Sequence, residues 1–414
     1  MMVLWLLAST LNGPAFASGY AVQQQSAQAA GLGYAATALS DSPAAAFYNP
    51  ALLTDDEGLR MSLGFSLAAS TITAQSLDAS PDAPWTAKTR SGVSTPPHLY
   101  ASYAKNNWAV GVTTNAAHAS RIRWANDWPY RFDIIESKPQ FFRFTGFVAY
   151  RFGTFSVAIG PQIDAGSLFI SKATNHITEE GSATLSLRGF GGGIHGSLAW
   201  TPTPNWTVGL RYWSRSGLKL SGEADFDMPP AFAHGYPDQQ VSTDWKLPDH
   251  LSMGVRWRLN TLALHADVSL SLWSVQQEVV FEFEQADPEP LRVEYNWRNS
   301  TALRLGAEWS VHKVVQLRAG TYLDGMPAPG PTLTLSPASP DNTRIGLTVG
   351  AGWRAHKHLT VHGFYEWMTI LPRDSESLDA PMARYSGTAH IGGLSIQGHF
   401  GARAAPDATE SSNP

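Results

Sequence analysis

The sequence predicts an all-β protein, a transmembrane antiparallel β-barrel of about fourteen strands. Three observations lead to this prediction. Apolar and polar residues alternate along the chain with a period of two. Short and long connections follow one another between the alternating stretches. Aromatic residues gather beside the short connections. Only helices and closed barrels satisfy every backbone group within lipid, and the period rules out helices here.

The alternation defines the expected strands. Apolar residues stand at every second position, as Leu251, Met253 and Val255 do around Ser252 and Gly254. Successive side chains of a strand point to opposite faces, so this pattern gives each strand one apolar face. The predicted strands span 58–68, 97–104, 108–116, 140–152, 155–170, 183–200, 206–220, 250–259, 261–283, 300–310, 314–323, 343–354, 358–369 and 388–400.

One predicted strand contains an irregularity. Within 183–200 the apolar positions change from odd numbers, such as Leu187, to even numbers, such as Ile194, across the run from Gly189 to Gly193. A β-bulge inserts one extra residue and produces such a change. We therefore predict a bulge at these glycines.

Charged residues indicate which face of the strands meets lipid. They stand opposite in parity to the apolar residues of their strand, so the apolar face is free of charge. A basic residue on the lipid side costs about 2–4 kcal/mol at mid-membrane. A soluble β-sandwich also alternates, so this observation supports the barrel without proving it. The set is Arg60, Arg143, Arg151, Asp164, Arg211, Arg215, Arg256, Arg258, Asp267, Arg304, Glu308, Arg318 and Glu366.

The connections and the aromatic residues separate the two folds. Short connections such as 153–154 alternate with long ones such as 117–139 and 221–249. Outer-membrane barrels have short periplasmic turns, long external loops and aromatic residues at the interfaces. A soluble protein has no reason to place tryptophans at alternate turns. The aromatic residues beside short turns are Trp108, Tyr150, Phe152, Phe155, Trp200, Trp206, Trp257, Trp309 and Trp353.

The chain ends and the composition limit the compartment and the partners. Residues 1–17 are apolar and finish in Ala15-Phe16-Ala17, so we expect a secretory signal peptide. The alternative is a mature start with an apolar end, because no basic residue precedes the apolar run. The net charge of −5 gives no basic surface for nucleic acid. Without cysteine the chain has no disulfides or thiol chemistry, and residues 401–414 form a polar tail.

Residues 18–57 interrupt the strand pattern before the barrel, which we place at 58–400. They are rich in small residues and contain an Asn-Pro turn signal. A barrel of this size has an interior that side chains alone do not fill, so we interpret the segment as a hatch inside the lumen. A flexible tail is the alternative. The expected hatch and gate residues are Gly31, Gly33, Asn49, Pro50 and Ala51.

These residues carry a family resemblance. Gly31-Leu32-Gly33 and Phe47-Tyr48-Asn49-Pro50-Ala51 resemble the N-terminal hatch of the FadL family of outer-membrane transporters for long-chain fatty acids and aromatic hydrocarbons. Further matches follow in order at 124–132, 267–273, 296–300, 303–309, 317–320 and 340–341. The resemblance covers nearly the whole mature chain. It implies a fourteen-stranded barrel with a hatch, and a sideways exit for ligand through a gap in the wall.

The resemblance also directs attention to basic residues. Fatty-acid members of the family use such residues near the bound carboxylate, but the matching position near Ser167 has none between Asp164 and Ile170. This departure leaves aromatic hydrocarbons as a substrate class beside fatty acids. Four arginines could bind a carboxylate from the lumen, and the alternative role of each is an internal ion pair. They are Arg188, Arg211, Arg215 and Arg318.

The resulting expectation is passive, ligand-selective uptake of small hydrophobic molecules. Trp124 and Trp128, in the external loop 117–139, would offer an apolar landing surface. We expect a monomer surrounded by outer-membrane lipid and lipopolysaccharide. A general polar porin and a surface adhesin are the alternatives on the same barrel.

No enzyme activity, metal or cofactor is expected. His265 and Asp267 share one inward face near a periplasmic turn, where a structural hydrogen bond is the favoured interpretation and hydrolysis the alternative. The inward histidines of other strands, His195, His362 and His399, have no spacing that specifies a metal site. No sequence motif for a catalytic serine, a zinc protease or a phosphate loop is present.

Overall fold

The structure is a computed structural model. It describes residues 19–55, 57–77, 84–90, 92–176, 179–285, 289–325, 336–340, 342–375 and 382–401. The expected signal peptide and the polar tail beyond residue 401 lie outside these ranges.

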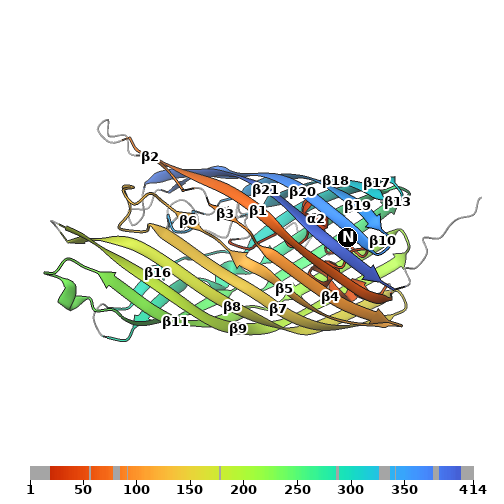
Figure 1. The fold of residues 1–414 in the computed structure, drawn as a ribbon, viewed down its shortest axis with the longest axis horizontal. Helices are drawn as coiled ribbons and strands as arrows, with labels where there is room; N and C mark the ends of the chain where they lie inside the picture. Colours follow the sequence, from red (N-terminus) through yellow and green to blue (C-terminus); the bar gives the residue numbers. More distant parts are fainter. Residues whose placement is uncertain are drawn as a thin grey trace, which may run out of the picture.

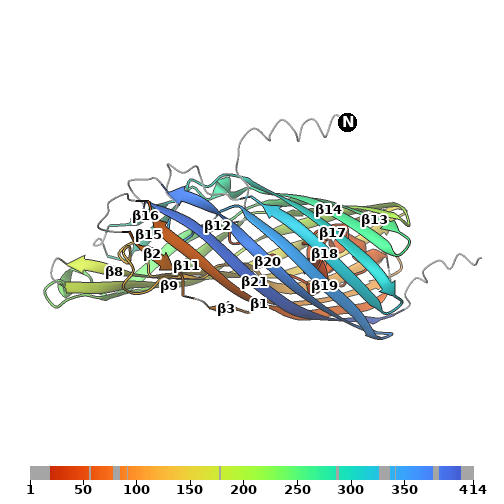
Figure 2. The same ribbon diagram turned by 90° about the horizontal axis from the view of Figure 1, so that it is seen from above.

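Fourteen antiparallel strands form a closed wall, which confirms the predicted barrel (Figure 1). They are β1 (Gly58–Ser76), β4 (Pro97–Lys105), β5 (Trp108–Ala119), β7 (Glu136–Phe152), β8 (Phe155–His176), β9 (Glu179–Thr203), β10 (Trp206–Trp213), β13 (His250–Leu259), β14 (Leu262–Ser271), β17 (Ser300–His312), β18 (Val315–Asp324), β19 (Arg344–His356), β20 (Leu359–Ser375) and β21 (Ala383–Phe400). The first and last strands pair from Leu59 opposite Phe400 to Ser76 opposite Ala383, and this seam closes the sheet (Figure 2).

Further strands extend the wall on the external side. β11 (Ser216–Asp227) pairs with β9 and with β12 (Gln239–Leu247), and β15 (Glu278–Phe283) pairs with β12 and β16 (Leu291–Glu294). These strands gather at the left end of the barrel (Figure 1). The remaining short elements are β2 (Thr86–Lys88), β3 (Val93–Ser94), β6 (Ile122–Arg123) and the 3-10 helix η2 (Ala233–Gly235).

Two predicted strands are divided, and the first is the span 206–220, which is interrupted at residues 214–215 between β10 and β11. The span 261–283 was expected to be continuous, but β14 ends at Ser271 and the 3-10 helix η3 (Trp273–Val275) follows before β15. Trp273 is fully buried in the interior, and the chain turns inward there to place it. Alternation resumes after the turn, which made the two strands look like one.

The predicted bulge at Gly189 to Gly193 is wrong. The register between β8 and β9 is unbroken from Phe155 opposite Trp200 to His176 opposite Glu179. The irregularity lies in the neighbouring strand, between β10 and β11. The parity of the apolar residues changes because the interior itself changes: toward the external end, it is apolar and the outer surface is polar.

The outward face has the predicted composition. Ile159, Val112, Leu305 and Val349 are all more than half exposed, as expected for side chains that face lipid. The aromatic residues beside the short turns point outward too, with Trp206 stacked on Trp257 at a centroid distance of 5.3 Å. They form the interfacial ring at the periplasmic end.

The inward face is polar and buried at the periplasmic end and mid-barrel. Most of the charged residues predicted to face inward are buried, and several form ion pairs across neighbouring strands. These pairs join Arg143 to Asp164 at 2.7 Å, Arg304 to Asp324 at 2.9 Å and Arg318 to Glu308 at 2.7 Å. Arg215 differs, because its side chain is 66% exposed and pairs with Asp249 beside the break between β10 and β11.

Residues 19–55 lie inside this wall, and we call them the inner segment. They include two short helices, α2 (Ala27–Ala30) and α3 (Ala45–Tyr48), and the 3-10 helix η1 (Pro50–Thr54). Figure 1 shows α2 enclosed by the strands. Almost every side chain from Gln25 to Leu39 is buried. None of the helices in the described ranges combines the length and hydropathy of a membrane span.

The lipid-facing wall can be tested at Val349, near the middle of the exposed apolar face of β19. Val349→Arg should lower the free energy of unfolding in lipid vesicles by about 2–4 kcal/mol, the cost of a basic side chain at mid-membrane. Ala355→Arg, at the periplasmic turn of the same strand, should cost about 0–1 kcal/mol. Equal costs in urea titrations would contradict the assignment of this face to lipid.

Candidate functional site

The wall holds the inner segment through buried hydrogen bonds to its backbone. The Asp267 carboxylate of β14 accepts N–H bonds from Ala36 at 3.0 Å and Thr37 at 2.8 Å. Across the barrel, the Asn49 side-chain amide donates to the carbonyls of Thr37 and Leu198, both at 3.0 Å. Because α2, α3 and η1 are too short to satisfy their own termini, the wall supplies the missing partners.

Glycines allow the inner segment to lie directly against the wall. Gly33 has a φ of 60°, and a Cβ there would lie 2.7 Å from the backbone nitrogen of Thr321. On β10, a Cβ at Gly209 would lie 2.1 Å from the Thr37 carbonyl oxygen. A larger residue at either position would force the two backbones apart.

The structure brings the five predicted hatch and gate residues into two groups. Gly31 and Gly33 contact β18 and β19, where Gly33 N–H donates to the Thr348 hydroxyl at 3.0 Å. Asn49, Pro50 and Ala51 lie against β9 instead, and Ala51 N–H donates to the Ser197 hydroxyl at 3.1 Å. The two groups are therefore anchors on different parts of the wall.

The first residues of the inner segment pair with a wall strand. Ala21 forms an antiparallel bridge with His118 of β5, flanked by hydrogen bonds from Val22 N–H to the Ala117 carbonyl and from Ala119 N–H to the Tyr20 carbonyl. At this level β5 has lost its other partner, because its pairing with β4 ends at Asn115. Its register with β7 also shifts between Ala116 and His118. The inner segment thus covers an irregular part of the wall.

Above the inner segment, the interior is filled by one apolar cluster. It comprises buried residues of β9, β11, β12 and β15 together with loop aromatics. Tyr20 lies at its lower edge and accepts a hydrogen bond from Trp245 Nε1 at 2.8 Å. The rings of Trp273 and Trp297 lie 5.0 and 5.6 Å from that of Tyr20. An apolar molecule entering from outside would meet this cluster before the inner segment.

Arg211 lies where the apolar cluster ends and the inner segment begins. Its side chain is buried on β10, donates to the Ser252 hydroxyl at 3.1 Å and lies 5.2 Å from the centre of the Phe47 ring. Among the described residues it forms no ion pair with a carboxylate. Asp267 lines the same cavity of about 60 Å³ and interacts electrostatically with Arg211; its Oδ2 accepts both inner-segment N–H bonds, and its Oδ1 has no hydrogen-bond partner among the described residues. Arg211 is thus a buried cation that forms no direct ion pair among the described residues and borders a small cavity.

The other predicted arginines have different positions. Arg318 is buried in the ion pair with Glu308, which is the alternative role considered for it. Arg188 is exposed on the outward face of β9, so its predicted place in the lumen is wrong. The alternation predicts that charged residues face the lumen in every strand. At the external end the interior is apolar, so charged residues such as Arg188 face outward. Arg215 is likewise outside the lumen.

The predicted landing surface is also wrong. Trp124 and Trp128 are 0% and 2% exposed, and their rings stack at 4.6 Å inside the external apolar cluster. Their indole nitrogens donate to the carbonyls of Pro337 and Ile134. The external loops pack on a core of their own, and these tryptophans hold that core together.

His265 and Asp267 do not bond to each other. Asp267 serves the inner segment, and neither ring nitrogen of His265 has a hydrogen-bond partner among the described residues. The expected hydrogen bond between them is absent because the Asp267 carboxylate accepts N–H bonds from the inner segment instead. The spacing of His265 and Asp267 in the sequence gives no sign of this contact. Within the described ranges, no group of three or more His, Asp or Glu could hold a metal ion.

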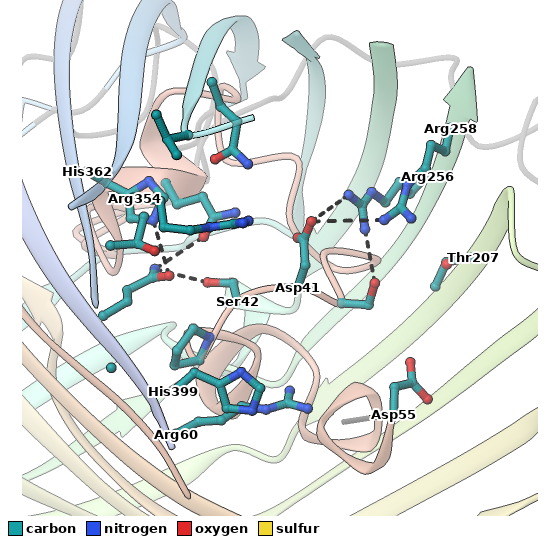
Figure 3. Close-up of a pocket in the computed structure, with 18 of the residues that line it drawn as sticks. Asp41, Ser42, Asp55, Arg60, Thr207, Arg256, Arg258, Arg354, His362 and His399 are labelled. Atoms are coloured by element: carbon teal, nitrogen blue, oxygen red, sulfur yellow. Dashed lines mark hydrogen bonds and ion pairs between the residues drawn. The ribbon is translucent and has the colours of Figure 1, made fainter. Parts of the chain in front are cut away.

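A second, polar cavity of about 490 Å³ opens at the periplasmic end (Figure 3). Asp41 of the inner segment binds Arg256 of β13 there at 2.8 Å, with Arg258 at 4.0 Å. Desolvation raises the pKa of Asp41, but the two guanidinium groups outweigh it and hold this pKa below its usual range. The ionised pair fastens the periplasmic side of the inner segment.

The closed fourteen-stranded wall with an occupied interior is shared with known proteins. The family model described as "outer membrane protein transport protein (OMPP1/FadL/TodX)" matches residues 8–377. The chain belongs to this family. It is therefore an outer-membrane protein of a family of transporters, as the sequence predicted.

Individual OMPP1/FadL/TodX relatives support the same fold. A FadL homologue of Pseudomonas aeruginosa has a TM-score of 0.81 at 18% identity, covering 92% of this chain and 100% of that one. The toluene transporter TodX of Pseudomonas putida has a TM-score of 0.71 at 14% identity, covering 92% and 100%. A putative outer membrane protein of Neisseria meningitidis serogroup B is 24% identical over 53% of each chain, so this chain matches about half the length of that curated relative.

Sequence reasoning missed the residues that line the interior above Arg211. Tyr20 was placed in the hatch region without a role, and Trp245 and Trp213 were not singled out. A signal was present in the parity change at Gly189 to Gly193, which marks where the interior becomes apolar. It was interpreted as a bulge because the interior was assumed to be polar throughout.

The anchoring of the inner segment predicts a conductance change. Asp267→Ala removes the acceptor for two buried N–H groups, which should cost about 1–3 kcal/mol and loosen the segment. Single barrels in planar bilayers should then open to ions about tenfold more often. Asp374→Ala, which breaks an exposed pair with Arg384, is the matched control and should leave conductance unchanged. Closed Asp267→Ala barrels would show that the inner segment is held by other contacts.

Proposed function

We propose that this protein is a passive, ligand-selective channel for small hydrophobic molecules, with long-chain fatty acids as its preferred class. The observation that carries this proposal is Arg211, a buried cation that forms no direct ion pair among the described residues and lies at the lower edge of an apolar cluster. A fatty acid has the complementary chemistry, since its chain suits the cluster and its carboxylate suits the guanidinium. A neutral aromatic hydrocarbon would use the cluster alone.

Entry requires the inner segment to move. The cavity beside Arg211, about 60 Å³, is too small for a long acyl chain, so a ligand has to displace neighbouring side chains. Tyr20 is the first candidate. Its ring lies between the apolar cluster, where it contacts Trp273, and the residues Val22 and His118 that line the cavity. In this proposal the inner segment acts as a hatch whose shift admits the ligand.

Release is proposed to be lateral, into the membrane. Support comes from β5, whose pairing with β4 ends at Asn115 and whose next residues pair with the inner segment instead. Withdrawal of Tyr20 to Val22 would leave this part of the wall without its inner cover. One chain closes the barrel through β1 and β21, so no second chain is needed to complete the wall, and the unit that we propose for transport is a monomer.

A general polar porin is the other candidate considered from the sequence. The inner segment argues against it, because its backbone bonds to β14, β9 and β19 lie across the lumen. The proposal therefore expects little ion conductance from the intact protein, whereas a porin would conduct freely.

The preference for a carboxylate is tested by Arg211→Gln in a Gram-negative host that lacks its own transporter. Loss of a charge-assisted hydrogen bond of about 1.5–3 kcal/mol should lower uptake of labelled oleate about 10- to 100-fold. Uptake of toluene should not change. Arg211→Lys, which keeps the charge, should retain most oleate uptake, and heat-modified mobility on gels checks that each barrel is folded. Equal loss of both substrates would mean that Arg211 has a structural role.

A further inference from the structure

The outward face of the external wall carries three exposed cations on neighbouring strands. Arg188 lies on β9, Lys219 on β11 and Lys246 on β12. The registers place Arg188 opposite Ser221, two residues from Lys219, and place Lys246 opposite Gly217, also two residues from Lys219. We call these three residues the cationic row. The strands β9 and β11 run side by side in Figure 1.

The height of the row follows from the periplasmic aromatic ring. Its members stand about twelve residues along the chain from Trp200, Trp206 and Trp257, respectively; the stretch to Trp200 lies within β9, and the other two cross the short breaks between β10 and β11 and between β12 and β13. With a rise of about 3.3 Å per residue and a tilt of about 40°, twelve residues climb about 30 Å. The apolar band of such barrels is about 25 Å tall. The row therefore lies just beyond the external edge of the hydrocarbon.

The cations of the row have no ion-pair partner within the described part of the chain. Asp244 is the cross-strand neighbour of Lys219, yet the structure records no ion pair between them. Some other exposed arginines toward the external side are paired, as Arg384 is with Asp374 at 2.6 Å. The row thus presents, at a similar depth, three exposed cations that form no ion pair within the described ranges, with the exposed Asp244 beside Lys219.

An exposed apolar side chain adjoins the row. Phe190 is 71% exposed and is the direct cross-strand neighbour of Lys219, and Ile194 follows below it on the same face of β9. Cations with an apolar surface directly beneath them match a lipid whose anionic head group lies above its acyl chains. The Arg188 guanidinium offers bidentate donors for a phosphate, and each lysine offers a further charge.

We propose that the cationic row binds the phosphate groups of lipid A, the phosphorylated glycolipid of the outer leaflet, with an acyl chain along Phe190 and Ile194. The inference rests on the outer-membrane location and the outward wall, and it is independent of the proposed transport function. A bound lipid A would hold the β9, β11 and β12 wall at one depth in the membrane.

The test compares the full barrel, purified in detergent, with a triple variant, Arg188→Gln, Lys219→Gln and Lys246→Gln. Binding of bisphosphorylated lipid A is measured by native mass spectrometry over a titration. The expected result is at least a tenfold weaker apparent Kd for the variant. The matched control is Lys105→Gln with Lys357→Gln, exposed lysines at periplasmic turns, which should bind as the parent does.

Two further ligands decide the chemistry. Lipid A without phosphates should bind the parent at least tenfold more weakly than bisphosphorylated lipid A does. Phosphatidylglycerol should bind the parent and the triple variant with the same affinity. Unchanged lipid A binding in the folded triple variant, or equal binding of the dephosphorylated lipid, would overturn the proposal. Oleate uptake by the triple variant should remain at the parent level, which separates this site from the lumen.

Discussion

The structure depends on one constraint, that every backbone polar group within lipid needs a partner inside the protein. The pairing of β1 with β21 meets it for the wall. Closure then creates an interior too wide for wall side chains alone, and the inner segment occupies it. Because that segment has only short helices, its own backbone N–H groups need partners as well, and Asp267, the Thr348 hydroxyl and the Ser197 hydroxyl supply them.

The same constraint explains how charge is distributed. At mid-barrel, the interior holds buried ion pairs such as Arg143 with Asp164, while Arg211, beside the inner segment, forms no direct ion pair among the described residues. Toward the external end, the interior becomes apolar and the charges move outside, where Arg188 lies. One wall therefore presents two chemistries, an apolar interior that ends near the buried Arg211 and a charged outer surface at the external end.

The sequence alone predicted the barrel because period-two alternation is local, and β8 shows it over many consecutive residues. Contacts between distant segments could not be predicted in this way. Nothing near Asp267 shows that it binds Ala36 and Thr37, so its neighbour His265 seemed the natural partner. Trp124 and Trp128 looked like exposed loop residues because the sequence does not show that external loops share a core. Arg188 was predicted to face the lumen because the alternation was interpreted with a polar interior along the whole barrel.

The central claim is that residues 20–22 cover an opening in the wall and must leave β5 for transport. Ala21 and His118 form a non-hydrogen-bonded antiparallel pair, whose Cα atoms lie about 4.5 Å apart, within reach of a disulfide. The chain has no cysteine of its own, so Ala21→Cys with His118→Cys creates one defined link. Oleate uptake should be lost when this link is oxidised and should return on reduction, with each single cysteine variant active throughout. Full uptake by the oxidised, fully linked protein would contradict the account.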